Sequence, residues 1–270
     1  MTDLKPLKDK TAIVTGAGRG IGMAIAEGFA KAGANVSIAA RSKEDLSSVE
    51  TQIKKFNSNV VAFQTDVSQS EDVDALVNNT LKSFGQIDIM VNNAGVYKEL
   101  ALVPFPDQIL TPPSVTRSSN ERMTDDEFRQ IIDTNIGGVF YGCRAVAPSM
   151  IDQKYGKIIN ISSIAASKAS TLQGVYAASK TAVNMLTSSL ALEWADYGIR
   201  VNSIAPGMYK TSMTSRAWDD PKRKQMMLGR IPLSEPGDMN GLVALGIFLA
   251  SKESDYITGQ TIYIDGGLSA

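Results

Sequence analysis

The 270-residue sequence contains no histidine and only one cysteine, Cys143. A zinc site built from histidine and cysteine is therefore excluded, and so is a serine or cysteine nucleophile activated by histidine. One cysteine cannot form an internal disulfide, which favours a reducing cytoplasm as the expected compartment. The chemistry has to rely on hydroxyl groups, lysine, carboxylates or a bound cofactor, and we expect no metal site.

Long apolar runs and an excess of one charge are also missing. No run approaches the roughly 18 to 20 apolar residues that a membrane span requires, and the polar start of the sequence has no signal-peptide core. The formal net charge is −1, so there is no electrostatic reason to expect a nucleic-acid or membrane partner. We therefore expect a cytoplasmic protein that binds a small molecule.

The sequence does contain a regular alternation of short β-branched runs with longer segments of helical period. We expect strands at 11–15, 35–40, 60–65, 87–92, 157–162, 199–205 and 261–265, and helices near 20–32, 43–56, 70–84, 124–150, 175–197 and 238–250. The apolar character of the strands is continuous rather than alternating, which is typical of a parallel sheet covered on both faces. This order predicts an α/β, Rossmann-like doubly wound fold, with one domain spanning residues 1–270.

Two segments depart from this alternation. Residues 97–123 contain four prolines, too many for the interior of a strand or helix. We expect this insertion to be either a mobile lid over the substrate site or a disordered surface loop. Residues 207–236 mix methionine, tyrosine and tryptophan with charges and prolines, and this mixture favours a flap that covers an apolar part of a substrate.

The first expected strand runs into a glycine-rich turn, "TGAGRGIG", and then into a helix. Gly16, Gly20 and Gly22 permit a tight turn and a close approach of the backbone to a phosphate. The N–H groups and the positive end of the following helix would then hold a pyrophosphate. A tight turn without a ligand is the alternative for this motif taken alone.

The second expected strand ends without an acidic residue, in the sequence "AARSK". A carboxylate at this position would bind the 2′-hydroxyl of an adenine ribose, whereas Arg41, together with Arg19, would complement a 2′-phosphate. We therefore expect NADP(H) to be preferred, with NAD(H) as the second choice, unless both arginines are merely solvated surface charges. Asp66 is expected either to accept a hydrogen bond from the adenine or to cap the next helix.

These features and others together resemble a short-chain dehydrogenase/reductase over essentially the full length of the chain. The matching residues are Thr15, Gly16, Gly20, Gly22, Asp66, Val67, Asn92, Asn93, Ala94, Gly95, Asn135, Ser163, Tyr176, Lys180, Asn202, Pro206, Gly207 and Thr211. The resemblance implies a seven-stranded parallel sheet with helices on both faces. It also implies that Asn135, Ser163, Tyr176 and Lys180 are the catalytic residues.

The resemblance assigns further roles to individual residues. Asn135 matches the position whose backbone holds a proton-relay water, and Ser163 matches the serine that orients the substrate carbonyl. Cofactor contacts are implied for Ile21, Val67, Asn93, Ala94, Gly95, Pro206, Gly207, Tyr209 and Thr211, the last at the nicotinamide carboxamide. Two features depart from the family pattern, namely the additional residues within 97–123 and Tyr209, where smaller β-branched residues are commoner.

Tyr176 and Lys180 are four positions apart, so on a helix their side chains lie on the same face. A free tyrosine has a pKa of about 10, and a nearby ammonium favours its ionised form. We expect Tyr176 to act as the general acid or base, with Lys180 lowering its pKa and Ser163 donating a hydrogen bond to the substrate oxygen. An exposed helical pair is the alternative interpretation of Tyr176 and Lys180, and Ser162 is the alternative to Ser163.

The sequence points less sharply to a substrate. Gln173 occupies a position that it also has in reductases of 3-oxoacyl thioesters, but the acidic "LEWADYG" is unlike a surface that binds an acyl-carrier protein. A sugar or polyol could use Gln173, Ser170 and Tyr97. We expect an enzyme that interconverts a carbonyl and a secondary alcohol; a catalytically idle nucleotide-binding sensor or scaffold and a nucleotide-sugar epimerase or dehydratase are the alternatives.

The expected helix at 175–197 is apolar on more than one face, with leucine, methionine and tryptophan along it. One face can cover the sheet, and the other would stay exposed unless a second chain covered it. The resemblance implies a homotetramer built on this helix and its neighbour.

Overall fold

The computed structural model describes residues 5–56, 59–103 and 122–270. Its centre is a sheet of seven parallel strands in the order β3-β2-β1-β4-β5-β6-β7. The strands are β1 (Thr11–Thr15), β2 (Asn35–Ala40), β3 (Val60–Gln64), β4 (Ile89–Asn92), β5 (Gly156–Ile161), β6 (Ile199–Pro206) and β7 (Thr261–Ile264). The predicted doubly wound fold with seven parallel strands is confirmed.

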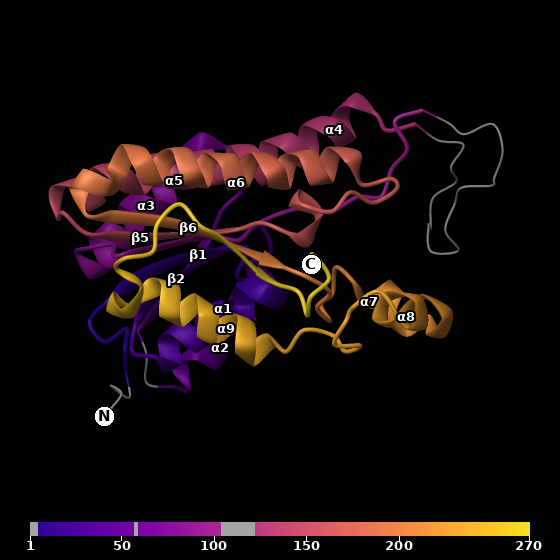
Figure 1. Cartoon of the computed structure of the whole chain (residues 1–270). Coiled ribbons are helices and arrows are strands. Elements are labelled where there is room, and N and C mark those ends of the chain that lie inside the picture. The colour runs from indigo at the N-terminus through magenta and orange to yellow at the C-terminus, as the bar shows by residue number, and fades with distance from the viewer. Residues whose placement is uncertain (1–4, 57–58, 104–121) are drawn as a thin grey trace.

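Helices form one layer on each face of the sheet (Figure 1). One layer contains α3 (Ser70–Phe84), α4 (Asp125–Ile132), α5 (Gly138–Asp152) and α6 (Gly174–Trp194), and the other contains α1 (Gly20–Lys31), α2 (Lys43–Lys54) and α9 (Met239–Ala250). Within the described ranges, no helix has the length and apolar character needed to cross a membrane.

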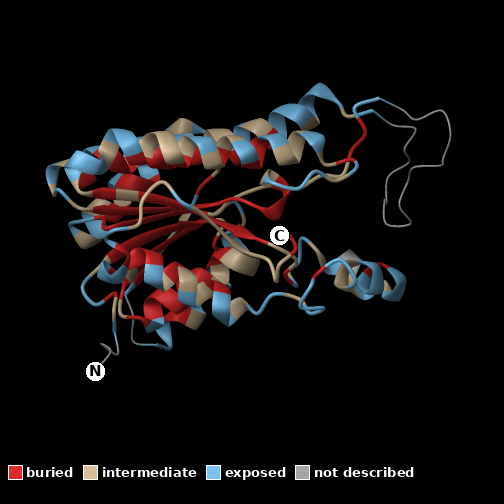
Figure 2. Cartoon of the chain, in the orientation of Figure 1, coloured by how far each residue is buried: buried red, intermediate tan, exposed pale blue. Residues whose placement is uncertain are grey.

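The sheet separates two apolar cores because successive side chains of a strand point to opposite faces. In β1, Ala12 and Val14 pack with α1, α2 and α9, whereas Ile13 packs toward α3, α5 and α6. Figure 2 shows the strands and the sheet-facing sides of the helices as buried. The continuous apolar runs of the strands follow from this burial on both faces.

The structure differs from the expected elements in two places. The expected helix at 124–150 is divided into α4 and α5 by a π-helical turn, Asp133–Gly137. The segment 207–236 contains two short helices that were not expected, α7 (Ser215–Asp219) and α8 (Pro221–Leu228). The side chain of Asp220 caps α8 and Pro221 is its first residue, so this helix start was visible in the sequence.

The expected lid at 97–123 is described only at its two ends, because residues 104–121 lie outside the described residues. The ends meet at a β-bridge between Ala101 and Arg122, and the Met123 N–H donates to the Ala101 carbonyl at 2.8 Å. The two described ends are therefore paired with each other, just before α4.

Candidate active site

The glycine-rich turn lies between the carboxyl end of β1 and the start of α1. The strand order reverses between β1 and β4, and a crevice at such a reversal is where doubly wound folds bind ligands. Gly16 and Gly20 have φ values of +64° and +58°, which favour glycine over other residues. A Cβ atom on Gly16 would lie 2.8 Å from the Ala94 Cα, so the turn packs tightly against the loop after β4.

The amino end of α1 fits an anionic group. Arg19 is the N-cap residue, and its side chain makes no capping hydrogen bond. The helix also has no acidic residue in its first turn, so no side-chain charge there competes with an anion. Together with the close-packed glycine turn, this end of α1 is suited to a pyrophosphate.

Asn93 joins the glycine turn to the loop that follows β4. Its Nδ2 donates to the carbonyl oxygens of Thr15 and Gly16 at 2.9 and 3.2 Å. The Thr15 hydroxyl in turn accepts from the N–H groups of Asn93 and Ala94 at 3.0 and 3.2 Å. The side chain of Asn93 is thus used to hold two loops together, and any contact with a cofactor falls to other atoms of this segment.

Arg41 lies beside a separate hollow of about 360 Å³, together with Gln64, Thr65, Asp66 and Asp72. Arg41 is exposed at the end of β2, and Arg19 is exposed at the glycine turn. The expected absence of an acid applies to the end of β2, but Asp66 in the loop after β3 and Asp72 in the first turn of α3 place two carboxylates at the same hollow. Asp66 does not cap a helix, because its Oδ1 accepts from the N–H and hydroxyl of Ser68 at 3.0 and 2.7 Å.

Tyr176 and Lys180 lie in the first two turns of α6. The Lys180 side chain is buried, and its Nζ donates to the Ile161 carbonyl at the end of β5 at 2.8 Å. Nζ lies 6.0 Å from the centre of the Tyr176 ring. A Cβ on Gly95 would lie 3.5 Å from Nζ and 3.3 Å from Asn135 Oδ1, so the loop after β4 lies close to both side chains at this point.

Asn135 lies in the π-helical turn between α4 and α5, a local geometry that is frequent at functional sites. It is fully buried, and its amide donates to the Val96 carbonyl and the Ser179 hydroxyl, both at 3.0 Å. Its Oδ1 accepts from the Val96 N–H at 2.8 Å. The side chain therefore fixes the loop after β4 to α6, one turn from Tyr176.

The two serines after β5 have different surroundings. Ser162 donates its hydroxyl to the Lys180 carbonyl at 3.1 Å, which directs it toward the backbone of α6. Ser163 caps a short helix by accepting from the Ala165 N–H at 3.1 Å, and its hydroxyl also lowers the pKa of Tyr176. Ser163 is thus the serine that interacts with the phenol.

The charge states of Tyr176 and Lys180 follow mainly from burial. Burial raises the pKa of Tyr176, an effect larger than the opposing influence of Ser163. Burial also lowers the pKa of Lys180, to about 8. In the protein without a cofactor, Tyr176 is therefore a protonated phenol at neutral pH, because burial outweighs any lowering of its pKa by Lys180.

The remaining expected cofactor residues surround the glycine turn to different extents. Thr211 lies against it, since a Cβ on Gly20 would be 3.6 Å from the Thr211 Cβ. Tyr209 is buried, with its ring against Gly237 and its hydroxyl 3.4 Å from the Ile264 carbonyl. Its side chain therefore belongs to the core. Ile21, in the first turn of α1, packs against the core. Val67 packs against Gly138, and Gly207, after Pro206, lies tightly against Asp265.

A polar group beside Tyr176 was only partly expected. The ring of Tyr97 meets the Tyr176 ring edge to face, with 4.9 Å between centroids. Gln173 Nε2 donates to the Tyr97 hydroxyl at 2.7 Å, and this hydroxyl donates to Glu99. Gln173 and Tyr97 were expected near a substrate, whereas Glu99 was not, because nothing in the proline-rich segment marks it.

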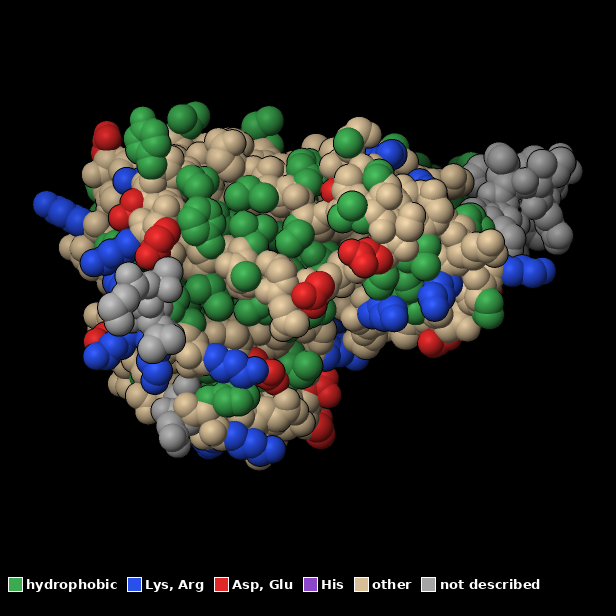
Figure 3. Space-filling view, turned by 60° about the horizontal axis from the view of Figure 1, so that its bottom comes forward, with side chains coloured by type: hydrophobic (Ala, Val, Ile, Leu, Met, Phe, Trp, Pro, Cys, Tyr) green, Lys and Arg blue, Asp and Glu red, His purple; other side chains and the backbone are tan. Residues whose placement is uncertain are grey.

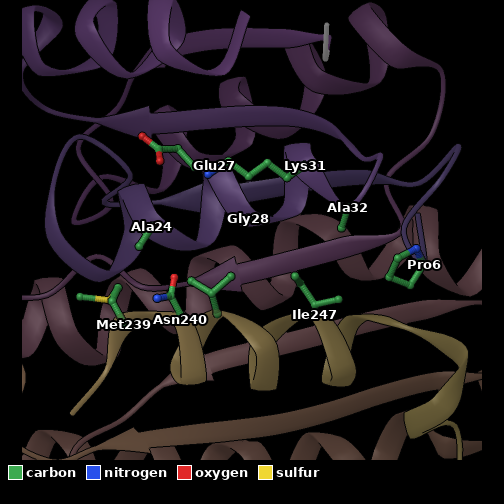
Figure 4. Close-up of a pocket in the computed structure, with 10 residues that line it drawn as sticks. Pro6, Ala24, Glu27, Gly28, Lys31, Ala32, Met239, Asn240 and Ile247 are labelled. Carbon is green, nitrogen blue, oxygen red and sulfur yellow. The ribbon is translucent and has the colours of Figure 1, made fainter. Parts of the chain in front are cut away.

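Another hollow, of about 510 Å³, lies away from these residues between α1 and α9 (Figure 4). Its lining includes Ala24, Gly28, Met239 and Val243. Because none of the expected catalytic residues borders it, it has no part in the chemistry considered below.

Comparison with known proteins identifies relatives along nearly the whole chain. Residues 16–269 match a family model described as enoyl-(acyl carrier protein) reductase. The chain is 38% identical to 3beta-hydroxysteroid dehydrogenase 1 of Eggerthella lenta over 265 residues, which cover 97% of this chain and 95% of the relative. It is 37% identical to a 3-oxoacyl-[acyl-carrier-protein] reductase of Staphylococcus epidermidis over 261 residues, covering 96% and 99%.

A solved structure of similar fold is the gluconate 5-dehydrogenase of Burkholderia cenocepacia, crystallised with NADP and tartrate. It is 34% identical, covers 99% of this chain and 98% of its own, and has a TM-score of 0.86. The three relatives act on a steroid, an acyl thioester and a sugar acid by their names, so the substrate of this chain does not follow from them.

Proposed function

The chain belongs to the short-chain dehydrogenase/reductase family, whose members oxidise alcohols or reduce carbonyl groups, and we propose that it interconverts a ketone and a secondary alcohol with NADP(H). The observation that carries the proposal is the meeting of Tyr176, Lys180, Asn135 and Gly95 beside the glycine turn. These residues come from three separate segments, and each is expected in the active site from the sequence.

The residues that would hold the cofactor fit it well. The glycine turn and the amino end of α1 would bind the pyrophosphate, and Arg41 would approach the 2′-phosphate of the adenosine ribose. The carboxylates of Asp66 and Asp72 at the same hollow limit this preference, so NAD(H) is proposed as the second choice. A bound nicotinamide dinucleotide supplies the hydride that reduction of a ketone requires.

The protein supplies the proton in this scheme. A ketone that gains a hydride at its carbon must gain a proton at its oxygen, and Tyr176 is protonated because burial raises the pKa of its phenol. Transfer of this proton leaves a phenolate, which the Lys180 ammonium stabilises. With a pKa of about 8, Lys180 is about nine-tenths protonated at pH 7. In the direction of oxidation, the phenolate accepts the proton of the alcohol.

Ser163 and Asn135 would support this transfer in different ways. The Ser163 hydroxyl lies at the buried end of β5 and would donate to the substrate oxygen as negative charge develops there. The Asn135 side chain holds the loop after β4 against α6 and so keeps Gly95 close to Lys180. By resemblance to the family, its backbone carbonyl would hold a water molecule that relays the proton.

The test is the variant Tyr176→Phe, assayed by NADPH oxidation at 340 nm with a panel of ketones. We expect turnover to fall about 100-fold or more, because general acid catalysis contributes on the order of 10² to 10⁴, while NADPH binding, measured by fluorescence, is retained. Tyr197→Phe is the matched control, since Tyr197 is exposed beyond the end of α6. Retention of more than about a tenth of the rate by Tyr176→Phe would remove Tyr176 from the mechanism.

We further propose a homotetramer in the cytoplasm. Met185 and Leu192 on α6 are 68% and 84% exposed, and Phe140 on α5 is 45% exposed, so the layer of α5 and α6 presents an apolar surface. Figure 3 shows a second apolar band, on the face that bears α1, α2 and α9, where Phe248 of α9 is also exposed. Two separate apolar surfaces suit a tetramer, which requires two kinds of interface.

A further inference from the structure

Three polar side chains from two distant segments form a hydrogen-bonded chain beside Tyr176. Gln173 immediately precedes α6, and its Nε2 donates to the Tyr97 hydroxyl at 2.7 Å. The Tyr97 hydroxyl donates to Glu99 Oε1 at 2.5 Å. Because the Tyr97 ring lies 4.9 Å from the Tyr176 ring, these three hydrogen-bonded side chains directly adjoin Tyr176, the residue proposed to transfer the proton.

The backbone holds these side chains together. The Leu100 N–H donates to the Leu172 carbonyl at 2.8 Å, which places residues 97–100 next to the residues before α6. Leu172 is buried, and it has a φ of +65°, a conformation that is strained for leucine. Strain of this kind persists only where the surroundings impose it, and here it sets the direction in which Gln173 leaves the loop.

The hydrogen-bonded group of Gln173, Tyr97 and Glu99 has unused acceptors but no unused hydroxyl donor. The Tyr97 hydroxyl accepts from Gln173 and donates to Glu99, so both of its functions are occupied. Burial and the nearby Glu99 charge raise the pKa of Tyr97, which keeps the hydroxyl protonated. Within the described part of the chain, Glu99 has no ion-pair partner and accepts only this one hydrogen bond.

A carboxylate in this state has clear preferences among ligands. It has several acceptor positions left, and hydrogen bonds to a charged acceptor are the stronger ones. A hydroxyl group of a substrate can donate to it, whereas an aliphatic chain leaves it without a partner and a second carboxylate is repelled. The only basic residue next to it in sequence, Lys98, instead approaches Glu127 at 3.7 Å.

We propose that Glu99, Tyr97 and Gln173 form a subsite for a hydroxyl group of the substrate, so that the enzyme acts on neutral hydroxylated ketones and polyols in preference to unsubstituted or anionic ketones. The inference rests on the proposed function, because it places this subsite beside the phenol that serves the carbonyl. Glu99 is the residue that determines specificity, and Tyr97 and Gln173 position it.

The experiment compares kcat/KM for cyclohexanone, its hydroxylated derivatives and 3-oxocyclohexanecarboxylate. We expect the best hydroxylated ketone to exceed cyclohexanone by about tenfold or more, the effect of one hydrogen bond to a charged group. In Glu99→Leu this ratio falls to about one, because the acceptor is gone. In Glu99→Gln the hydroxyl preference weakens, and discrimination against the carboxylate disappears because the charge is removed.

Tyr97→Phe tests the positioning role, since it keeps the ring against Tyr176 and removes only the hydroxyl. It should lower the ratio of kcat/KM between the hydroxylated ketone and cyclohexanone, mainly because KM for the hydroxylated ketone rises more than KM for cyclohexanone. Glu50→Gln on α2, whose partner is the exposed Lys54, and Tyr197→Phe are the matched controls. Ratios between substrates cancel a general loss of active protein, so a variant that folds poorly still gives an answer.

The inference is overturned if the wild type prefers cyclohexanone or the carboxylate, or if the hydroxyl preference survives in Glu99→Leu. If no ketone is reduced with either cofactor, the proposed function fails, and the subsite is then judged by thermal unfolding in the presence of NADP and a hydroxylated cyclohexanone. A rise in Tm for the wild type but not for Glu99→Leu supports the subsite, whereas equal behaviour of the two proteins overturns it.

Discussion

Replacing Lys180 with methionine should stabilise the protein while it abolishes the activity. Lys180 carries an ammonium group that is only 4% exposed, and the hydrogen bond to the Ile161 carbonyl is all that compensates it among the described residues. Methionine has a similar length and no charge, so Lys180→Met removes the buried charge with little change in packing. The buried Lys180 ammonium therefore lowers the stability of the wild type, a cost that is typical of a residue kept for function.

The size of the effect follows from the pKa of Lys180. The fall from 10.5 to about 8 on folding corresponds to about 3 kcal/mol of destabilisation at neutral pH. Leaving the Ile161 carbonyl without its donor returns about 1 kcal/mol of this. Lys180→Met should therefore be about 2 kcal/mol more stable than the wild type at pH 7.

The difference in the free energy of unfolding between Lys180→Met and the wild type should become smaller as the pH rises. The unfolded chain keeps the proton of Lys180 up to about pH 10.5, whereas the folded chain keeps it only up to about pH 8. The unfolded state thus binds more protons between these values, so the wild type gains stability as the pH rises from 8 to 10.5. Near pH 10 the lowered pKa of Lys180 destabilises the wild type by less than about 1 kcal/mol, so the two proteins should have nearly equal stability.

Thermal unfolding without cofactor, at one fixed protein concentration, measures this difference. For a chain of 270 residues, about 2 kcal/mol corresponds to a Tm about 3 to 4 °C higher for Lys180→Met at pH 7, and the gap should close by pH 10. Lys82→Met, at an exposed position of α3, is the control and should show no such gap. A variant that melts at or below the wild-type temperature at pH 7, or a gap that is the same at pH 10, refutes the reasoning.

Three further predictions concern cofactor, turn and assembly. Arg41→Ser should raise KM for NADPH about 10-fold or more and leave KM for NADH nearly unchanged; equal effects on both would argue against a 2′-phosphate contact. Gly22→Ala should lower Tm by several degrees and weaken NADPH binding measured by fluorescence, because its Cβ would lie 2.3 Å from Asn93 Nδ2 and 2.4 Å from the Gly16 carbonyl oxygen. Leu192→Glu should dissociate the tetramer in light scattering, and a wild type that is already monomeric would disprove the proposed assembly.

The fold could be predicted from the sequence because the residue pattern of its strands indicates where they lie. Runs such as "TAIVT" and "NVSIAA" do not alternate strictly between apolar and polar residues, which is typical of strands buried on both faces of a sheet, and β1 and β2 have the expected bounds. The break between α4 and α5 could not be predicted in this way. It is followed directly by Gly138, where a Cβ would lie 2.8 Å from Val67 Cγ2, a close contact between residues far apart in the sequence that periodicity does not indicate.

The pairing of Tyr176 with Lys180 shows what helical spacing can predict. A separation of four residues places both on one side of α6, and the structure brings both toward the end of β5 and the loop after β4. Spacing does not determine where the ammonium binds. Its hydrogen bond to the Ile161 carbonyl and its distance of 6.0 Å from the Tyr176 ring depend on strand β5. In the protein without a cofactor, burial raises the pKa of Tyr176.

Glu99 illustrates why substrate specificity is the hardest part to predict. It lies in a segment whose prolines argue against regular structure, and its closeness in sequence to Tyr97, its hydrogen-bond partner, does not indicate that both lie beside Tyr176. Its position is set by Leu172, which is strained at a positive φ without being glycine, and by a hydrogen bond across 72 positions of the chain. The residues proposed to contact the cofactor follow from local turns and spacing, whereas the proposed subsite arises only when two loops are packed together. Loops can therefore change the substrate while the residues that transfer the proton remain the same.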